Sequence, residues 1–175
     1  ASVLAKVVFA DPELTLALPP AVTAATGMDA LTHNIESYLS PAYHPLCDGI
    51  ALEGVRIAAR SLETAVKEPG NIAARSEMLM ASMMGAIAFQ KDLGAVHSCA
   101  HALSTVADLH HGLANGIMID HVMRFNLPAA VAKMAELARV TAAPGGGSGS
   151  EEARAQAFVD HLAAPMTGRA GAFER

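Results

Sequence analysis

The sequence predicts an all-α fold, a helical bundle with one short N-terminal strand. From Leu18 onward, apolar residues recur at intervals of three and four, which places them on one face of a helix. Proline and glycine punctuate the chain between segments of helical length. Only residues 6–11 (KVVFAD) form a β-branched and aromatic run, which Pro12 stops, so this run is the one predicted strand.

Helices account for the rest of the main body. Their predicted bounds lie near 20–25, 28–39, 45–66, 71–90, 94–106, 112–126, 128–142 and 151–163. Thr26 precedes the second of these helices, as an N-cap residue does. Pro45 occupies a first-turn position and Asn71 precedes an alanine-rich run, so both residues mark helix starts.

The end of the chain has a different composition. Residues 144–150 (PGGGSGS) predict a flexible loop, because glycine loses much backbone entropy when it is ordered. After Ala164 no periodicity remains, and a poorly ordered tail is expected. The predicted organisation is a main helical domain over residues 1–143, a loop over 144–150, and a last helix with a tail over 151–175.

Composition excludes several classes of protein. A chain of 175 residues has room for one domain, and 52% hydrophobic against 17% charged residues excludes general disorder. The net charge of -5 and the lack of any run of Lys or Arg argue against nucleic acid as a partner. The longest uncharged apolar stretch, residues 78–89, is shorter than the roughly 20 residues of a membrane span, so no membrane partner is expected.

Cysteine usage and the first residues predict a cytoplasmic location. Cys47 and Cys99 lie far apart and form no pair motif, which is typical of a reduced protein rather than a disulfide-stapled one. Residues 1–15 lack the charged start, apolar centre and small-residue cleavage site of a signal peptide.

Histidine is enriched, with 8 residues against 2 tyrosines and no tryptophan, and several histidines stand at helical spacing. Asp29 and His33 are four residues apart, so one face of a helix carries both. His97 and His101 repeat this spacing, and His111 follows with His110 at the next helix start. Fe²⁺ and Zn²⁺ accept imidazole nitrogen together with carboxylate oxygen. The pattern therefore predicts a metal site made of one aspartate and three histidines.

Ordinary structural roles are the alternative for each of these residues. Asp29 and His33 could form a surface pair, or the aspartate could stand near a helix N-terminus where its charge is favoured. His33 and His110 could be surface or core residues, and that interpretation is preferred for three further histidines, His44, His121 and His161.

Several strings occur in an order that resembles the iron-containing, or group III, alcohol dehydrogenases. They are DPELTLALP (11–19), TGMDALTHNIESYLSP (26–41), AFQKDLGAVHSCAHALSTVADLHHGLANG (88–116) and HVMRFN (121–126). The resemblance extends over about residues 7–140. It implies that Fe²⁺, or Zn²⁺, is held by four ligands, Asp29, His33, His97 and His111. It also implies that His101 lies beside the nicotinamide and the substrate and relays a proton, whereas His110 receives no role.

The same resemblance implies a fold and a reaction. The chain looks like the C-terminal, all-helical metal domain of a two-domain dehydrogenase with a dehydroquinate synthase-like fold, without its N-terminal α/β domain. The N-terminal α/β domain would bind most of the NAD or NADP and would carry the phosphate-binding GGGS turn. Residues 145–148 (GGGS) are therefore not taken for that turn. The implied activity is the interconversion of a small alcohol and an aldehyde by hydride transfer, with the metal as a Lewis acid, in a homo-oligomer. The sequence departs from the family pattern at Asp92, where relatives usually carry a small residue, and again after Pro144.

Two other functions remain open at the level of sequence. The chain could be a non-catalytic, stand-alone helical metal-binding or assembly module, with an apolar docking face at Met78, Met80, Met83 and Met84, although a core position for these methionines is preferred. A related metal domain could also serve a lyase or a glycerol-type dehydrogenase. The HALST and DLHHG strings match the alcohol dehydrogenase branch more closely.

Overall fold

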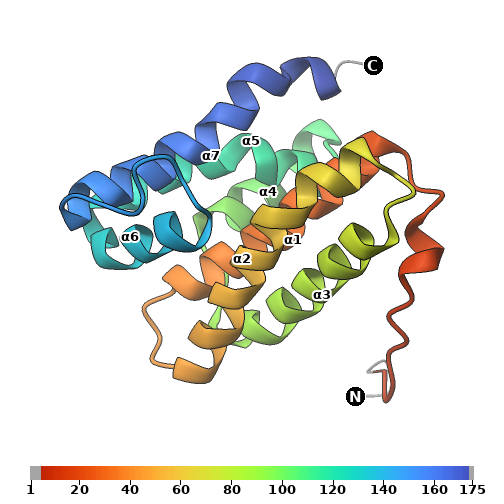
Figure 1. The fold of residues 1–175 in the computed structure, drawn as a ribbon, viewed down its shortest axis with the longest axis horizontal. Helices are drawn as coiled ribbons and strands as arrows, with labels where there is room; N and C mark the ends of the chain where they lie inside the picture. Colours follow the sequence, from red (N-terminus) through yellow and green to blue (C-terminus); the bar gives the residue numbers. More distant parts are fainter. Residues whose placement is uncertain (1–4, 174–175) are drawn as a thin grey trace.

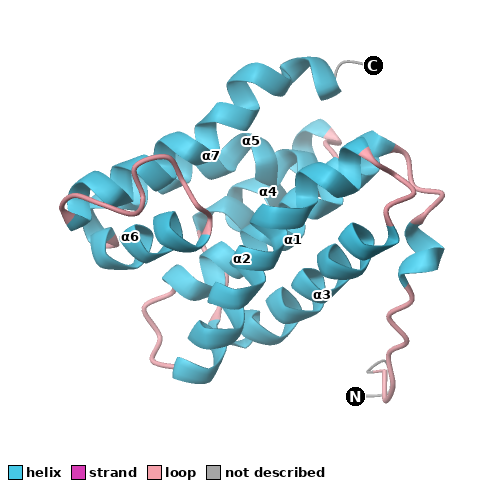
Figure 2. Ribbon diagram, viewed as in Figure 1, coloured by secondary structure: helices cyan, strands magenta, loops and turns pink. Residues whose placement is uncertain are grey.

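A computed structural model describes the backbone of residues 5–173 and the side chains of residues 5–163. The described chain is mainly helical, with an extended segment before the first helix and short connections between the helices (Figures 1 and 2). Its α-helices are α1 (Pro20–Leu39), α2 (Pro45–Lys67), α3 (Ile72–Ala88), α4 (Ala95–Ala107), α5 (His111–Asn126), α6 (Val131–Val140) and α7 (Glu151–Phe173). Three short 3₁₀ segments accompany them, η1 (Pro12–Thr15), η2 (Phe89–Lys91) and η3 (Leu127–Ala129). The predicted all-α fold is confirmed.

The predicted strand is wrong. Residues 6–11 form an extended loop outside the bundle, next to the N-terminus in Figure 1. Val7, Val8 and Phe9 are 67%, 72% and 89% exposed, so their side chains do not enter the core. A β-strand needs a neighbouring strand to pair its backbone hydrogen-bonding groups, and the described part of this chain is otherwise helical. β-Branched composition alone could not supply that partner.

Helix α1 is continuous where the sequence predicts two helices. Thr26 is not an N-cap, because its hydroxyl donates to the carbonyl oxygen of Val22, one turn earlier, at 2.8 Å. Gly27 does not break the helix but allows α2 to approach it, since a Cβ there would lie 2.2 Å from Leu62 Cδ1. The glycine therefore reflects close helix packing.

The other two helix starts are confirmed. Pro45 is the first residue of α2, and the Nδ1 atom of His44 accepts a hydrogen bond from the Cys47 N–H at 3.3 Å. Asn71 caps α3, because its Oδ1 atom accepts from the Ala74 N–H at 3.1 Å. His44 therefore has the structural role that the sequence favours for it.

Helix α1 packs against α2, α3 and α5, whereas α4 pairs with α5 and α6 pairs with α7. The largest fully buried side chains come from several helices and include Ile35, Val55, Met123, Met134 and Phe158. This arrangement places α1 against α5, which pairs with α4, and α4 and α5 carry the other histidine motifs. Asp29 and His33 thus face α4 and α5 across one side of α1.

The methionine-rich helix α3 is only partly core. Met78 is buried, Met83 and Met84 are half-buried, and Met80 is 47% exposed, so the expected core position holds for one of the four. Within the described residues, Ile72–Lys91 is the stretch long and apolar enough to cross a membrane by length and composition, with mean hydropathy 1.2. The core helix of a folded domain meets the same criterion.

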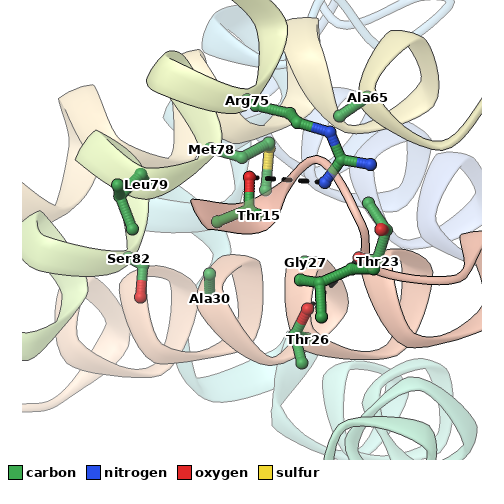
Figure 3. A pocket seen from close by; sticks show the side chains of 11 residues that line it. Thr15, Thr23, Thr26, Gly27, Ala30, Ala65, Arg75, Met78, Leu79 and Ser82 are labelled. Carbon is green, nitrogen blue, oxygen red and sulfur yellow. Dashed lines mark hydrogen bonds between the residues drawn. The ribbon is translucent and has the colours of Figure 1, made fainter. Parts of the chain in front are cut away.

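Between α1, α3 and η1 lies a cavity of about 240 Å³ (Figure 3). Buried Arg75 closes one side of it. The Arg75 Nη1 atom donates to Thr15 Oγ1 at 3.4 Å, and its Nε atom donates to the carbonyl oxygen of Pro69. These contacts hold η1 and the start of α3 together.

The end of α7 also differs from the prediction. The helix continues to Phe173, whereas the sequence predicts its end near residue 163. Pro165 argues for an end in the sequence, but a proline removes one backbone hydrogen bond and can kink a helix without ending it. Residues 144–150 form turns and bends between α6 and α7, as predicted.

Asp92 follows η2 with φ 92° and ψ 158°, a backbone region that glycine adopts readily and other residues rarely do. Strain of about 1–3 kcal/mol is typical of such positions. Asp92→Gly is expected to raise the free energy of unfolding by about 1 kcal/mol in urea denaturation, because relief of strain exceeds the added chain entropy. Asp108, at φ 52° and ψ 31°, is the control, since aspartate tolerates that region. An equal or larger gain in Asp108→Gly would contradict this explanation.

Candidate metal centre

Helices α1, α4 and α5 bring three of the predicted ligands together. Asp29 Oδ1 lies 3.4 Å from His97 Nε2 and 3.4 Å from His111 Nε2. One ligand atom from each of the three side chains lies within 4.8 Å of the others, close enough to share one ion. His97 is buried, whereas Asp29 and His111 are half-buried, so the cluster is open on one side.

His33 lies beside this cluster without joining it. Its ring centroid is 4.2 Å from that of His97, and its Nδ1 atom lies 3.5 Å from Asp29 Oδ1. The same Nδ1 atom donates to the backbone carbonyl oxygen of Asp29 at 2.9 Å. Because Nδ1 is used in this way, Nε2 is the nitrogen that His33 has available for an ion.

His101 lies next to the cluster and outside it. Its ring centroid is 4.8 Å from that of His111 and 6.4 Å from that of His97, and its side chain is exposed. His110 is the residue before α5 and does not belong to the cluster. The remaining histidines lie away from the cluster, His44 at the residue before α2, His121 on α5 and His161 on α7.

Asn115 is a site residue that the sequence reasoning missed. Its Nδ2 atom donates to Asp29 Oδ1 at 2.6 Å and lies 3.4 Å from His97 Nε2 and 3.2 Å from His111 Nε2. The residue is fully buried, and its Oδ1 atom has no partner in the described structure. Its position four residues after His111 is the signal that could have found it, because both side chains share one face of α5.

Glu36 is the second missed residue. It is 3% exposed, and its Oε2 atom accepts from His97 Nδ1 at 2.7 Å. Glu36 follows Asp29 by seven residues, or about two helical turns, so Asp29, His33 and Glu36 lie along one stripe of α1. That spacing is visible in the sequence. The spacing does not reveal the partner of Glu36, because His97 lies sixty-one residues further along the chain.

The electrostatics of the cluster favour positive charge. Burial disfavours charged His97, but its hydrogen bonds with Asp29 and Glu36 outweigh burial and raise the pKa to about 9. Burial also opposes ionisation of the two carboxyls, yet hydrogen bonding with His97 lowers the pKa of Asp29 and of Glu36. Burial lowers the pKa of His111, against the opposing effect of Asp29. The carboxylates of Asp29 and Glu36 thus both stabilise the protonated form of the His97 imidazole.

The donor set fits a divalent transition metal. A carboxylate oxygen and two Nε2 atoms converge, and a third imidazole lies in ring contact with them. Such ions accept nitrogen and oxygen donors together. The Nδ1 atoms of His33 and His97 are each hydrogen-bonded to an oxygen acceptor, which leaves Nε2 of each ring available to an ion. In this structure the polar N–H₂ group of Asn115 lies against all three converging ligand atoms.

A larger cavity, of about 530 Å³, is lined by Glu36. Asp92 and Gly94 line it, together with residues from the ends of α1 and α5. Asp92 therefore shares this cavity with Glu36, and Asp92 is exposed. Asp29, His97 and His111 do not line this cavity.

Comparison with known proteins gives a consistent set of relatives. The model of the Fe-containing alcohol dehydrogenase family, C-terminal part, matches residues 23–169. The 4-hydroxybutyrate dehydrogenase of Cupriavidus necator is 47% identical over 131 residues, and the 1,3-propanediol dehydrogenase of Klebsiella pneumoniae is 44% identical over 131 residues. These matches cover 72% and 74% of this chain and 34% of each relative.

Solved structures agree with the sequence matches. A 1,3-propanediol oxidoreductase superposes with a TM-score of 0.85 and 39% identity, covering 89% of this chain and 41% of that one. An alcohol dehydrogenase from Oenococcus oeni gives 0.82 and 33% identity, covering 86% and 39%. The chain thus spans about a third of the length of the curated relatives it matches. It belongs to the iron-containing alcohol dehydrogenase family and corresponds to the C-terminal helical domain of those enzymes.

Proposed function

We propose that this chain is the metal-binding domain of an oxidoreductase that interconverts a small alcohol and an aldehyde with NAD or NADP. The convergence of Asp29, His97 and His111, in a chain of this family, is the observation that supports the proposal most strongly. The relatives act, by their names, on 4-hydroxybutyrate and 1,3-propanediol. We propose the broader class, a small alcohol or aldehyde, for this chain.

We propose Asp29, His33, His97 and His111 as the ligands of one Fe²⁺ or Zn²⁺ ion. When bound, such an ion acts as a Lewis acid that stabilises negative charge on a substrate oxygen. The chain contributes by holding one carboxylate and three imidazoles on three helices, with Asn115 donating to the carboxylate oxygen. His111 and Asp29 form the half-buried side of the cluster, where a substrate can approach.

His101 is the proposed catalytic residue. It lies one helical turn after His97 and beside His111, and its side chain is exposed. An imidazole in that position can receive a proton from a substrate hydroxyl and release it to water. NAD or NADP would be held mainly by a dinucleotide-binding domain outside this chain. Assembly as a homo-oligomer and a cytoplasmic location also remain proposals.

A chimeric enzyme tests this function. This chain would replace the matching region of the Klebsiella pneumoniae 1,3-propanediol dehydrogenase, to which it is 44% identical. We expect alcohol-dependent reduction of NAD⁺ or NADP⁺, measured by absorbance, and no reduction in the chimera with His97→Ala. A folded chimera that binds the dinucleotide and one equivalent of metal, yet turns over no small alcohol, would contradict the proposal.

His101→Ala is expected to lower kcat of this chimera by about 10²–10⁴-fold, the usual range for loss of a general acid or base. Metal content should stay at the level of the unmutated chimera, because His101 lies outside the ligand cluster. Mass spectrometry and steady-state kinetics measure the two quantities. Loss of metal in His101→Ala equal to that in His97→Ala would show that the assigned roles are wrong.

A further inference from the structure

Glu36 connects α1 to the start of α4 through one buried carboxylate. It belongs to α1, and both of its oxygens are directed at the start of α4. Oε1 accepts from the Val96 N–H at 2.7 Å, whereas Oε2 accepts from the His97 N–H at 3.2 Å and from His97 Nδ1 at 2.7 Å. Backbone and ring of His97 are thus held by the same group.

Helix α4 has no capping side chain of its own. Its N-cap residue is Gly94, which leaves the first N–H groups of the helix without a local acceptor. Glu36 accepts two of these N–H groups from across the helix interface, and a carboxylate is electrostatically favoured at a helix N-terminus. Gly94 is also needed for this contact, because a Cβ there would lie 2.5 Å from Glu36 Oε1.

The contact determines which nitrogen of His97 faces the cluster. A proton on Nδ1 is donated to Glu36, so the lone pair of the neutral ring is on Nε2, which lies 3.4 Å from Asp29 Oδ1. We propose that Glu36 is a positioning residue of the metal centre, which fixes the orientation and the tautomer of His97 so that Nε2 is presented to the ion. This inference rests on the proposed metal-binding function.

Metal affinity of the purified chain provides the test. Glutamine at position 36 keeps the size of the side chain but turns one acceptor oxygen into an N–H₂ donor that faces N–H groups of α4. We expect Glu36→Gln to raise the Kd for Zn²⁺ by about 10–100-fold, the usual cost of losing a hydrogen-bonding partner of a metal-ligating histidine. The control is Glu53→Gln, which removes an exposed pair with Arg56 on α2 and should leave Kd unchanged.

A second variant disturbs the contact without altering either partner. Gly94→Ala displaces Glu36 sterically, and the backbone at Gly94, with φ -111°, accepts alanine. We expect this variant to raise the Kd for Zn²⁺ as well. In the double variant Glu36→Gln/Gly94→Ala, the fold-increase in Kd should be smaller than the product of the two single fold-increases, because both substitutions disturb the same contact. If Glu36→Gln does not fold, Gly94→Ala decides the matter by itself.

Cobalt spectra separate positioning from helix capping. If Glu36 only capped α4, its substitution would lower Tm of the metal-free chain but leave the Kd and the visible spectrum of bound Co²⁺ unchanged. That result would overturn the inference. Positioning predicts a shifted Co²⁺ spectrum together with the raised Kd. A wild-type chain that binds neither Zn²⁺ nor Co²⁺ would instead refute the proposed metal-binding function, which distinguishes the two failures.

Discussion

His111→Ala and His97→Ala are each expected to weaken binding of Fe²⁺ or Zn²⁺ by about 10²–10³-fold. Structural four-ligand zinc sites gain about 10–16 kcal/mol on binding, so one ligand accounts for roughly 2.5–4 kcal/mol. Both histidines place Nε2 at 3.4 Å from Asp29 Oδ1, so removal of either leaves an incomplete donor set. Competition with a chelator of known affinity measures the change in Kd.

His121→Ala is a matched control for His111→Ala. Both histidines belong to α5, but His121 is exposed and lies outside the cluster. The control variant should retain the wild-type Kd within a factor of about two, since surface substitutions have small effects. Equal weakening in His121→Ala and His111→Ala would mean that the ion is held somewhere other than at the three converging side chains.

Gly112→Ala is expected to lower the free energy of unfolding by about 3 kcal/mol or more. Gly112 is the second residue of α5, and it contacts the backbone of α1 directly. A Cβ at this position would lie 2.1 Å from the Ala25 carbonyl oxygen and 2.5 Å from its carbonyl carbon. Backbone atoms cannot rotate away as a side chain does, so α5 must move, and overpacking of this kind is costly. Urea denaturation of the metal-free chain measures the loss.

Displacement of α5 should also reach the metal centre, because His111 immediately precedes Gly112 and Asp29 is on α1. Gly112→Ala is therefore expected to raise the Kd for the metal as well. Gly49→Ala provides the opposite control. Gly49 is exposed within α2, and nothing lies within 4 Å of a Cβ there. Alanine should stabilise α2 by about 0.5–1 kcal/mol. A stable Gly112→Ala variant would contradict the close approach of α1 and α5.

Helical spacing predicts much of the fold, because each helix carries its own apolar period. The start of α2 at Pro45 and the cap of α3 at Asn71 are local features, and both are confirmed. The predictions that are wrong concern segments whose structure depends on packing against other parts of the chain. Gly27 resembles a break between two helices, yet it is where Leu62 of α2 approaches α1. Residues 6–11 have strand composition, yet no described strand lies beside them.

The metal cluster was predictable in part, because some of its residues are linked by local helical spacing. The four-residue spacing of Asp29 and His33 is local, and the family resemblance adds His97 and His111 from distant segments. The structure brings three of these four together and places His33 beside them.

Asn115 and Glu36 act through contacts between helices. Asn115 reaches Asp29 across eighty-six residues of sequence, and Glu36 reaches His97 across sixty-one. Sequence spacing alone shows that each shares a helix face with a ligand. It does not show which group on another helix it meets.

Anomalous diffraction from crystals of the chain loaded with Fe²⁺ or Zn²⁺ would test the metal centre most directly. One anomalous peak is expected about 2.0–2.2 Å from an oxygen of Asp29 and from the Nε2 atoms of His33, His97 and His111. Glu36 should remain hydrogen-bonded to His97 Nδ1 in the loaded structure. A peak held by other residues, or no peak at this cluster under saturating metal, would contradict the assignment.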